Sequence, residues 1–305
     1  MSTPWQIVAD IGCEVGESPF WHPQEQMLYW VDIPAKKIHR SNVFMGTVES
    51  WLLAEPHALE PGCIAPATSG GLVLGLRDGV YRAKVWGGPL EQLAAATHDP
   101  ATTRFNDGKC DTEGRFWAST IYEPRDQRLA ELFCLQGNEL QRKAGDATVG
   151  NGLAWSPDGG TLYWSDTTAH VIRAWDRDAA SCVLSAPRIF HQFPLKPAGW
   201  QPGMTGYGGR PDGASVDSQG NYWVAMFEGG RVLKLSRDGT VLADIPTPVR
   251  CPTMVCFGGD DLQTLYLTSA RHGRPAQELA ELPLSGAVLA MRVDVPGLPV
   301  NFFAG

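Results

Sequence analysis

The chain contains 305 residues, of which 43% are hydrophobic and 19% are charged. This composition excludes a mostly disordered chain and provides enough apolar side chains for a large core. The formal net charge of −8 repels phosphate backbones and anionic membrane surfaces, so neither nucleic acid nor a membrane is an expected partner.

The N-terminal residues and the cysteines indicate a cytoplasmic protein. The segment MSTPWQIVADIG lacks the positive region and the apolar region that together make a secretory signal. Apolar runs such as GLVLGL have the length of a strand and are too short to span a bilayer. The seven cysteines are an odd number at irregular spacings without a CxxC pair, which is typical of reduced thiols.

One pattern recurs along the chain. Each copy has a Gly- or Pro-flanked polar residue, a short apolar strand, a polar turn and an aromatic-rich strand. In chain order the copies occupy residues 16–33, 61–76, 105–120, 150–167, 211–227 and 251–270, the second and the last being weaker. Further hairpin segments follow several copies, such as KKIHR and VIRAWD. A small antiparallel sheet that recurs about every 45 residues is typical of propeller blades.

We therefore predict an all-β fold, a six-bladed β-propeller whose four-stranded antiparallel blades surround a central channel. Residues 1–305 are expected to form this single domain. A Pro- and Gly-rich insert near residues 191–210 stretches one interval, and we interpret it as a long surface loop. The tryptophans at positions 30, 117, 164 and 223 recur in the aromatic-rich strands and are expected to pack inside the blades.

Four copies carry an oxygen-bearing side chain at an equivalent position. In each copy this residue precedes the tryptophan by one of two intervals, which differ only in the length of the turn. The residues are Glu17, Asn106, Asn151 and Asp212. Each of them alone could be an ordinary turn residue. The innermost strands of a propeller line its channel, however, so equivalent positions converge at one depth and could bind a hard cation.

The motifs that contain these residues resemble those of the regucalcin (senescence marker protein)/gluconolactonase/luciferin-regenerating enzyme family. They are GESPFW, RFNDGKCD, GNGLAWSPD, RPDGASVDSQGNYWVA and VCFGG, in this order along nearly the whole chain. The resemblance implies a lactonase that uses one divalent metal ion to hydrolyse a sugar lactone, an aldonolactone, to the aldonic acid.

The resemblance also implies which residues bind the metal. Glu17, Asn151 and Asp212 match the family's metal ligands, and Asp212 also matches its usual general base. Our hypothesis is that one Asp212 oxygen binds the metal while the other takes a proton from the attacking water, whose pKa the metal lowers. Two carboxylates and an amide suit Ca²⁺, Mg²⁺ or Mn²⁺ and accept Zn²⁺ or Fe²⁺, so the metal's identity stays open.

Three further residues are candidates for binding the substrate. By the same resemblance, Arg104 and Asn106 match residues that contact the substrate's hydroxyl groups. Glu123 is the candidate for an additional acidic contact, although the strand before it departs from the family's pattern. The expected partner is a small-molecule sugar lactone, and the chain is expected to be a monomer or a weak homo-oligomer.

Two other functions remain open at this point: a metal-dependent esterase or organophosphate hydrolase, and a non-catalytic propeller that binds calcium or docks proteins. The chain has no GxSxG elbow, Walker A motif or dinucleotide-binding glycine motif, which disfavours a serine esterase and a nucleotide enzyme. The seven histidines, including His22, His57, His98 and His272, lack paired ligand spacing and are expected at the surface or rim.

Overall fold

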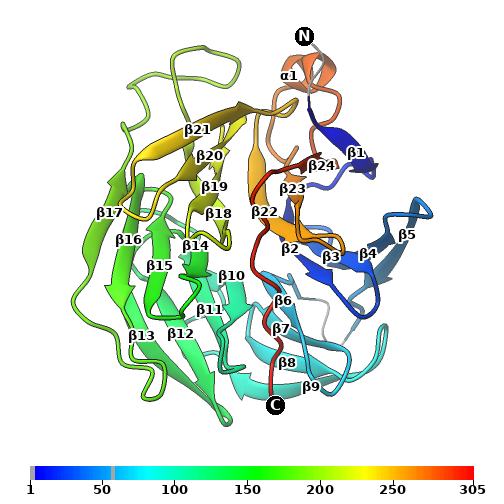
Figure 1. Cartoon of the computed structure of the whole chain (residues 1–305), viewed down its shortest axis with the longest axis vertical. Helices are drawn as coiled ribbons and strands as arrows, with labels where there is room; N and C mark the ends of the chain where they lie inside the picture. Colours follow the sequence, from blue (N-terminus) through cyan, green and yellow to red (C-terminus); the bar gives the residue numbers. More distant parts are fainter. Residues whose placement is uncertain (1–3, 56–58) are drawn as a thin grey trace.

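The computed structural model describes residues 4–55 and 59–305. Within these residues the chain forms 24 strands in six four-stranded sheets, together with one short helix. The sheets are arranged around a common axis like the blades of a propeller (Figure 1), and two cavities lie along this central channel. The predicted all-β, six-bladed β-propeller with four-stranded antiparallel blades is therefore confirmed.

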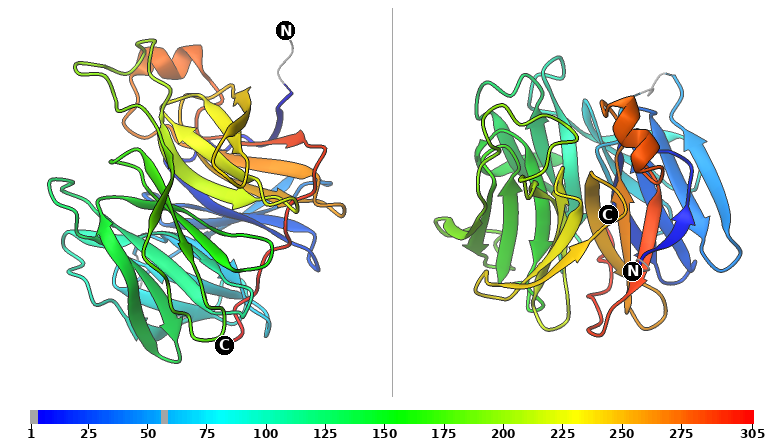
Figure 2. Two further views of the ribbon diagram at one scale, coloured as in Figure 1. Left: turned by 60° about the vertical axis from the view of Figure 1, so that its left-hand side comes forward. Right: turned by 90° about the horizontal axis from the view of Figure 1, so that it is seen from above.

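Five blades consist of four consecutive strands each, with the first strand innermost and the fourth at the outer edge (Figures 1 and 2). These strands are β2 (Gly16–His22), β3 (Met27–Asp32), β4 (Lys37–Asn42) and β5 (Thr47–Leu52); β6 (Cys63–Pro66), β7 (Leu72–Leu76), β8 (Gly79–Ala83) and β9 (Leu90–Ala95); β10 (Thr103–Cys110), β11 (Phe116–Tyr122), β12 (Ala130–Gln136) and β13 (Glu139–Ala147); β14 (Gly150–Trp155), β15 (Thr161–Asp166), β16 (Val171–Asp176) and β17 (Arg188–Gln192); and β18 (Arg210–Val216), β19 (Tyr222–Phe227), β20 (Arg231–Leu235) and β21 (Val241–Pro246).

The sixth blade joins the two ends of the chain. Its strands lie in the order β1 (Gln6–Ala9), β24 (Val288–Arg292), β23 (Thr264–Ser269) and β22 (Pro252–Gly258). The helix α1 (Ala276–Glu281) lies between β23 and β24 in the sequence. Because β1 comes from the N-terminal region and its three partners come from the C-terminal region, their hydrogen bonds close the ring.

Two aspartates bind the turns between the first two strands of their blades. Asp111 accepts two backbone N–H groups of its own turn and, at 2.8 Å, the indole N–H of Trp117. Asp217 makes the same kind of contacts, with the indole N–H of Trp223 at 3.0 Å. In these two blades the interval between the repeated polar residue and the tryptophan is the shorter one, and the aspartate stabilises the shorter turn. The four repeated tryptophans are all at most 4% exposed, as predicted.

The segment after β24 runs back across one end of the channel (Figure 1, red). It forms isolated bridges from Gly297 to Asp217 and from Phe303 to Ala67, which belong to different blades. The Asn301 side chain donates to the carbonyl oxygen of Cys110 at 3.1 Å. This segment therefore covers the channel at the end where the innermost strands finish.

The structure corrects one expectation about the histidines. His22, His39 and His170 are buried, at 7%, 3% and 4% exposure, whereas all histidines were expected at the surface or rim. Each of the three rings packs against another aromatic ring and uses a ring nitrogen in a hydrogen bond to a nearby group. His57 lies outside the described residues.

Residues 193–209, between β17 and β18, contain neither helix nor strand and form the long loop at the position of the predicted insert. Its aromatic residues Trp200 and Tyr207 are buried and pack edge to face, with ring centroids 5.2 Å apart. The seven cysteines all lie in the described part of the chain, where they are buried and free of disulfides. No helix within residues 4–55 and 59–305 is long and apolar enough to cross a membrane.

Candidate functional site

A pocket with a volume of about 380 Å³ lies where the innermost strands begin. It brings together all the residues predicted for metal and substrate binding. They are Glu17 on β2, Arg104 and Asn106 on β10, Glu123 after β11, Asn151 on β14 and Asp212 on β18. The four residues at equivalent repeat positions are buried, with exposures between 3% and 9%. These side chains thus converge at one end of the channel, as the repeat indicated.

The innermost strands are irregular where they carry these side chains. The pairing register shifts directly after Glu17 and Asn151, and it shifts across the positions of Asn106 and Asp212. Such bulges re-aim a side chain that would otherwise follow the strict alternation of a strand. Gly152, which follows Asn151, has a φ of 63°, and an added Cβ would lie only 2.3 Å from the Tyr222 hydroxyl oxygen.

The two weaker repeats also place residues at the positions equivalent to Glu17, Asn106, Asn151 and Asp212. These residues were not predicted from the sequence. In the last blade Thr253 lines the pocket and lies at the same kind of register shift, between Pro252 and Met254. In the second blade Gly62 stands before β6, and an added Cβ would lie 2.1 Å from the carbonyl oxygen of Phe105. The backbone that carries Asn106 therefore occupies the space of a side chain at position 62. Aligning the weaker repeats with the stronger ones would have pointed to both positions.

A chain of hydrogen bonds orients Asn151. Asn106 Nδ2 donates to Asn151 Oδ1 at 2.8 Å, and Asn151 Nδ2 donates to Thr167 Oγ1 at 2.8 Å. The Thr167 hydroxyl in turn donates to the carbonyl oxygen of Pro211 at 2.7 Å. Because that hydroxyl has a single proton, it can only accept from Asn151, so the Asn151 amide oxygen faces Asn106 with one lone pair to spare.

Arg104 and Glu123 belong to a second polar network at the pocket rim. Arg104 Nη1 donates to Asn106 Oδ1 at 3.0 Å, and Arg104 Nε lies 3.4 Å from Glu123 Oε1. Both Glu123 oxygens also accept from Arg77, which pairs with Glu60 as well. Glu123 is therefore largely occupied by arginines. In this geometry it fixes the guanidinium of Arg104 beside Asn106.

Three buried carboxyl groups lie close enough to affect one another. Burial, followed by the charges of Asp212 and Asp107, holds the pKa of Glu17 well above its usual range. Burial likewise raises the pKa of Asp212; Arg210 opposes this effect and Asp107 adds to it. Asp107 Oδ2 accepts the Leu153 N–H at 2.9 Å, but Asp107 Oδ1 has no hydrogen-bond partner within the described residues.

These observations fit a divalent cation. Several buried carboxylates without enough positive partners are unfavourable unless a cation compensates them. Two carboxylates and an amide oxygen, from Glu17, Asp212 and Asn151, are oxygen donors of the kind that hard cations prefer. Asp107 lies beside this set and adds negative charge.

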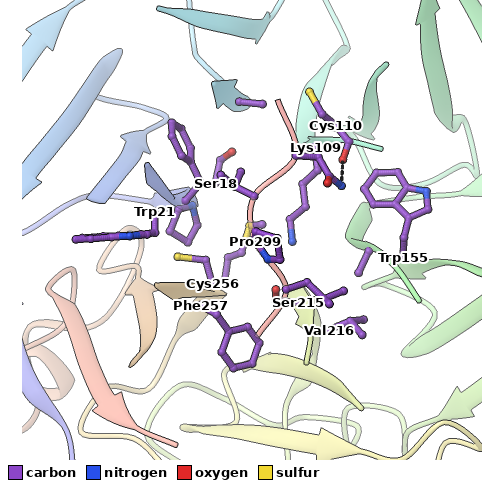
Figure 3. A pocket seen from close by; sticks show the side chains of 18 of the residues that line it. Ser18, Trp21, Lys109, Cys110, Trp155, Ser215, Val216, Cys256, Phe257 and Pro299 are labelled. Carbon is purple, nitrogen blue, oxygen red and sulfur yellow. Dashed lines mark hydrogen bonds between the residues drawn. The ribbon is translucent and has the colours of Figure 1, made fainter. Parts of the chain in front are cut away.

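A second cavity, of about 210 Å³, lies at the covered end of the channel. Figure 3 shows Trp21, Trp155 and Phe257 around it, Pro299 of the C-terminal segment across it, and Lys109 reaching into it. Lys109 donates to the carbonyl oxygen of Ala214, and burial lowers its pKa. The lining of this second cavity is mostly apolar, so the carboxylates, amides and arginines that could bind a metal or a substrate lie at the open end of the channel.

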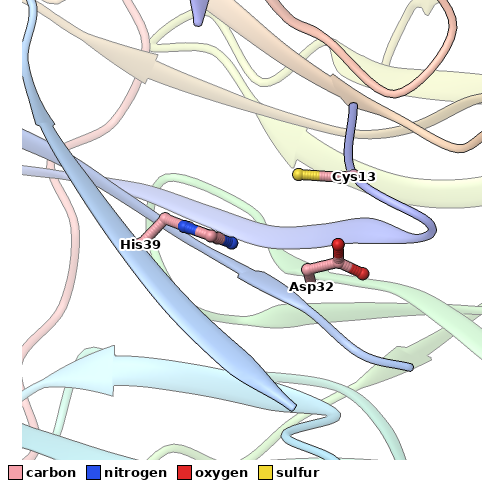
Figure 4. A group of neighbouring side chains, drawn as sticks. All are labelled: Cys13, Asp32 and His39. Atoms are coloured by element: carbon pink, nitrogen blue, oxygen red, sulfur yellow. The ribbon is translucent and has the colours of Figure 1, made fainter. Parts of the chain in front are cut away.

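Cys13, Asp32 and His39 form a separate buried group whose potential ligand atoms lie within 4.8 Å of one another (Figure 4). Both Asp32 oxygens accept backbone N–H groups, those of Glu14 and Val15 at 3.0 and 3.1 Å. Burial raises the pKa of the Cys13 thiol to about 12, and a metal binds the thiolate rather than the thiol. We therefore interpret this group as structural.

His39 gives a prediction about stability. Burial lowers its pKa to about 4, with Asp32 opposing and Lys37 adding to the shift, whereas an unfolded chain has a histidine pKa of about 6.5. As the pH falls, the histidine of the unfolded state binds a proton first. The contribution of neutral His39 to the free energy of unfolding is therefore complete above about pH 6.5 and is lost toward pH 4. Acidification from pH 7 to pH 5 is expected to cost about 2 kcal/mol of unfolding free energy through this residue.

Urea unfolding of the wild type and of His39→Gln at both pH values measures this effect. The variant is expected to be less stable at pH 7 but to lose less stability on acidification. The same loss in both proteins would contradict the assignment to His39.

Comparison with known proteins identifies the fold family. Residues 15–271 match the SMP-30/Gluconolactonase/LRE-like region. The chain belongs to this family. It is 45% identical over 294 residues to a 6-deoxy-6-sulfogluconolactonase from Pseudomonas putida, covering 95% of each chain. It is 33% identical over 298 residues to a regucalcin from Danio rerio, covering 96% of this chain and 95% of the relative.

A solved structure shares the fold of this chain. A regucalcin from Agrobacterium tumefaciens, described as a calcium-binding protein, superposes with a TM-score of 0.88 at 22% identity and covers 98% of this chain and 97% of its own. The predicted family is thus confirmed, and the lactonase named among its members agrees with the predicted enzyme class.

Proposed function

We propose that this member of the family hydrolyses an aldonolactone to the aldonic acid with the help of one divalent cation. The observation that carries the proposal is the convergence of Glu17, Asn151 and Asp212 at the open end of the channel, with Arg104 and Asn106 beside them. The curated relative that acts on a gluconolactone derivative, similar along nearly the whole chain, supports the reaction class.

In this proposal Glu17, Asn151 and Asp212 hold the cation. When bound, it would polarise the lactone carbonyl and lower the pKa of the attacking water. Asp212 takes a proton from that water through the carboxylate oxygen that does not bind the cation. Both amide protons of Asn106 are already donated, to the Gly150 carbonyl oxygen and to Asn151 Oδ1, and its oxygen accepts from Arg104. The second lone pair of that oxygen is left to accept a substrate hydroxyl.

The remaining rim residues orient the lactone. Arg104 has several guanidinium N–H groups beside the pocket, and these donate to ring oxygens or hydroxyl groups. Glu123 and Arg77 keep this guanidinium in place through the rim network. We propose a sugar lactone with a C6 sulfonate as the first substrate to try, because the relative from Pseudomonas putida is named for a 6-sulfo compound.

The test is hydrolysis of a panel of lactones by metal-stripped protein, followed with a pH indicator, with Ca²⁺, Mg²⁺, Mn²⁺, Zn²⁺ or Fe²⁺ restored one at a time. Turnover that returns with one metal supports the proposal. Faster turnover of aryl esters or organophosphates than of any lactone would favour the esterase alternative. Metal binding without turnover of either substrate class would favour a non-catalytic, calcium-binding propeller.

Thr167 gives a prediction about the metal site. Thr167→Val removes the hydroxyl that accepts the Asn151 amide N–H at 2.8 Å, so Asn151 loses the contact that orients its oxygen. The metal affinity is expected to fall roughly tenfold, as for other groups that orient a ligand, while kcat at saturating metal changes little. Titration of activity against metal concentration measures this shift. Thr167→Ser keeps the hydroxyl and serves as the control; equal affinity in both variants would contradict the role.

A further inference from the structure

One side of the pocket is positively charged although the chain as a whole is acidic. Arg125 and Arg210 both line the pocket beside Asp212. Neither was among the residues predicted from the sequence. The pocket lining also contains Glu17, Glu60, Glu123 and Asp212, so the positive charge is local to the side that carries these two arginines.

Arg210 shares its acidic partner with two other cations. Its Nη2 lies 3.3 Å from Glu228 Oε2, and Lys196 Nζ lies 2.5 Å from the same oxygen. Arg274 Nη1 lies 3.0 Å from Glu228 Oε1, and Arg274 is also paired with Glu278 at 2.7 Å. Two carboxylates therefore face three cations in this network, and Asp212 is a further carboxylate on which the charge of Arg210 acts.

Arg125 adds a second positive charge without a partner. It follows β11 in a turn with a φ of 62°, an uncommon backbone conformation for a residue with a side chain. Within residues 4–55 and 59–305 its guanidinium makes no hydrogen bond or ion pair. Arg125 is exposed at the pocket rim, and partial desolvation there together with the charge of Arg210 lowers its pKa. Two arginines that repel each other at the edge of a pocket are stabilised when an anion binds between them.

Arg125 and Arg210 lie where they could contact the exocyclic carbon of a sugar lactone, at the end away from its carbonyl. Arg210 is the first residue of β18 and its guanidinium lies over the ring of Phe227, 5.2 Å from the centroid, which limits its movement. Asp212 is two residues further along, and two residues of a strand span about 6 to 7 Å. A lactone whose carbonyl lies at Asp212 can therefore direct its exocyclic carbon toward Arg210 and Arg125.

We propose that Arg125 and Arg210 form a subsite for an anionic group on the exocyclic end of the lactone. This inference rests on the proposed lactonase function. The anion is a sulfonate, phosphate or carboxylate, since guanidinium groups bind the oxygens of all three. The subsite makes the enzyme selective for charged over neutral aldonolactones.

The experiment compares kcat/KM for glucono-1,5-lactone and for the same lactone with a C6 sulfonate. The wild type is expected to prefer the sulfonated lactone. Arg125→Gln and Arg210→Gln are each expected to lower kcat/KM for the sulfonated lactone by about 10- to 100-fold, mainly through KM, because a charge-assisted hydrogen bond is lost. The neutral lactone should lose much less kcat/KM than the sulfonated one, and the loss that it shows should fall on kcat, because both arginines also lower the pKa of Asp212.

Arg188→Gln is the matched control. It removes the same charge from an outer strand, where Arg188 is half exposed and paired with Asp176, and both lactones should keep their wild-type kcat/KM. Thermal unfolding of each variant establishes that it is folded. Equal losses for both lactones in the folded Arg125 and Arg210 variants, or no loss for the sulfonated one, would overturn the subsite.

Failure of the proposed function is distinguishable from failure of the subsite. If the wild type hydrolyses neither lactone with any metal, calorimetric binding of 6-sulfogluconate to the wild type and to Arg125→Gln tests the subsite directly. Binding that is lost in the variant supports it. Absence of binding to the wild type, or equal binding to both proteins, overturns it.

Discussion

Asp212→Asn is expected to lower kcat for lactone hydrolysis by roughly a thousandfold, the magnitude typical of losing a general base. The substitution keeps the size of the side chain and one of its oxygen atoms, but it removes the carboxylate that accepts the proton of the attacking water. Asp212 is 6% exposed, so little bulk water reaches it to replace that function. Steady-state kinetics at saturating metal measures the effect.

The metal content of the Asp212 variant decides how the loss is interpreted. A variant that binds the metal but does not turn over supports the role as a base, whereas near-normal turnover with metal bound moves that role to another group. Asp294→Asn is the control, because Asp294 is exposed and remote from the pocket, and its kcat should equal that of the wild type.

Glu17→Gln is expected to weaken metal binding by about a hundredfold and to abolish activity at limiting metal. The reason is that one of the two carboxylates of the donor set becomes a neutral amide, while the buried position and the bulge on β2 remain. Excess metal should restore much of the turnover, since Glu17 has no proton to transfer in the proposed reaction.

Rescue by excess metal distinguishes the role of Glu17 from that of Asp212. Titration with metal should recover activity in Glu17→Gln but not in Asp212→Asn. If excess metal rescued both variants equally, Asp212 would be a ligand only. If it rescued neither, Glu17 would have a part in the chemistry beyond holding the cation.

The fold could be predicted because the same sequence pattern recurs in each blade. The repeated turns and tryptophans give the blades, and the same repeats place Glu17, Asn151 and Asp212 at one depth. The closure of the ring could not be predicted in this way. β1 has only four residues and pairs with β24, almost the whole chain away, so no local pattern signals the contact.

The contacts that complete the site escaped prediction for a similar reason. Thr167 orients Asn151 from the end of a neighbouring strand, and Arg125 reaches the pocket from a hairpin turn. Nothing in the sequence around either residue distinguishes it from an ordinary turn residue. Glu123 stays a predicted substrate contact, but in the structure it also pairs with two arginines, Arg77 and Arg104, which no local sequence pattern indicates.

The pairing of β1 with β24 has a consequence for how the protein is made. During synthesis β1 leaves the ribosome before its partner β24 and stays unpaired until residues 288–292 have emerged. Five blades can form in order behind it, because each is built from consecutive strands with local turns. The last step is therefore a joining of distant segments, which is slow compared with hairpin formation. An unpaired strand edge is prone to aggregation in that interval.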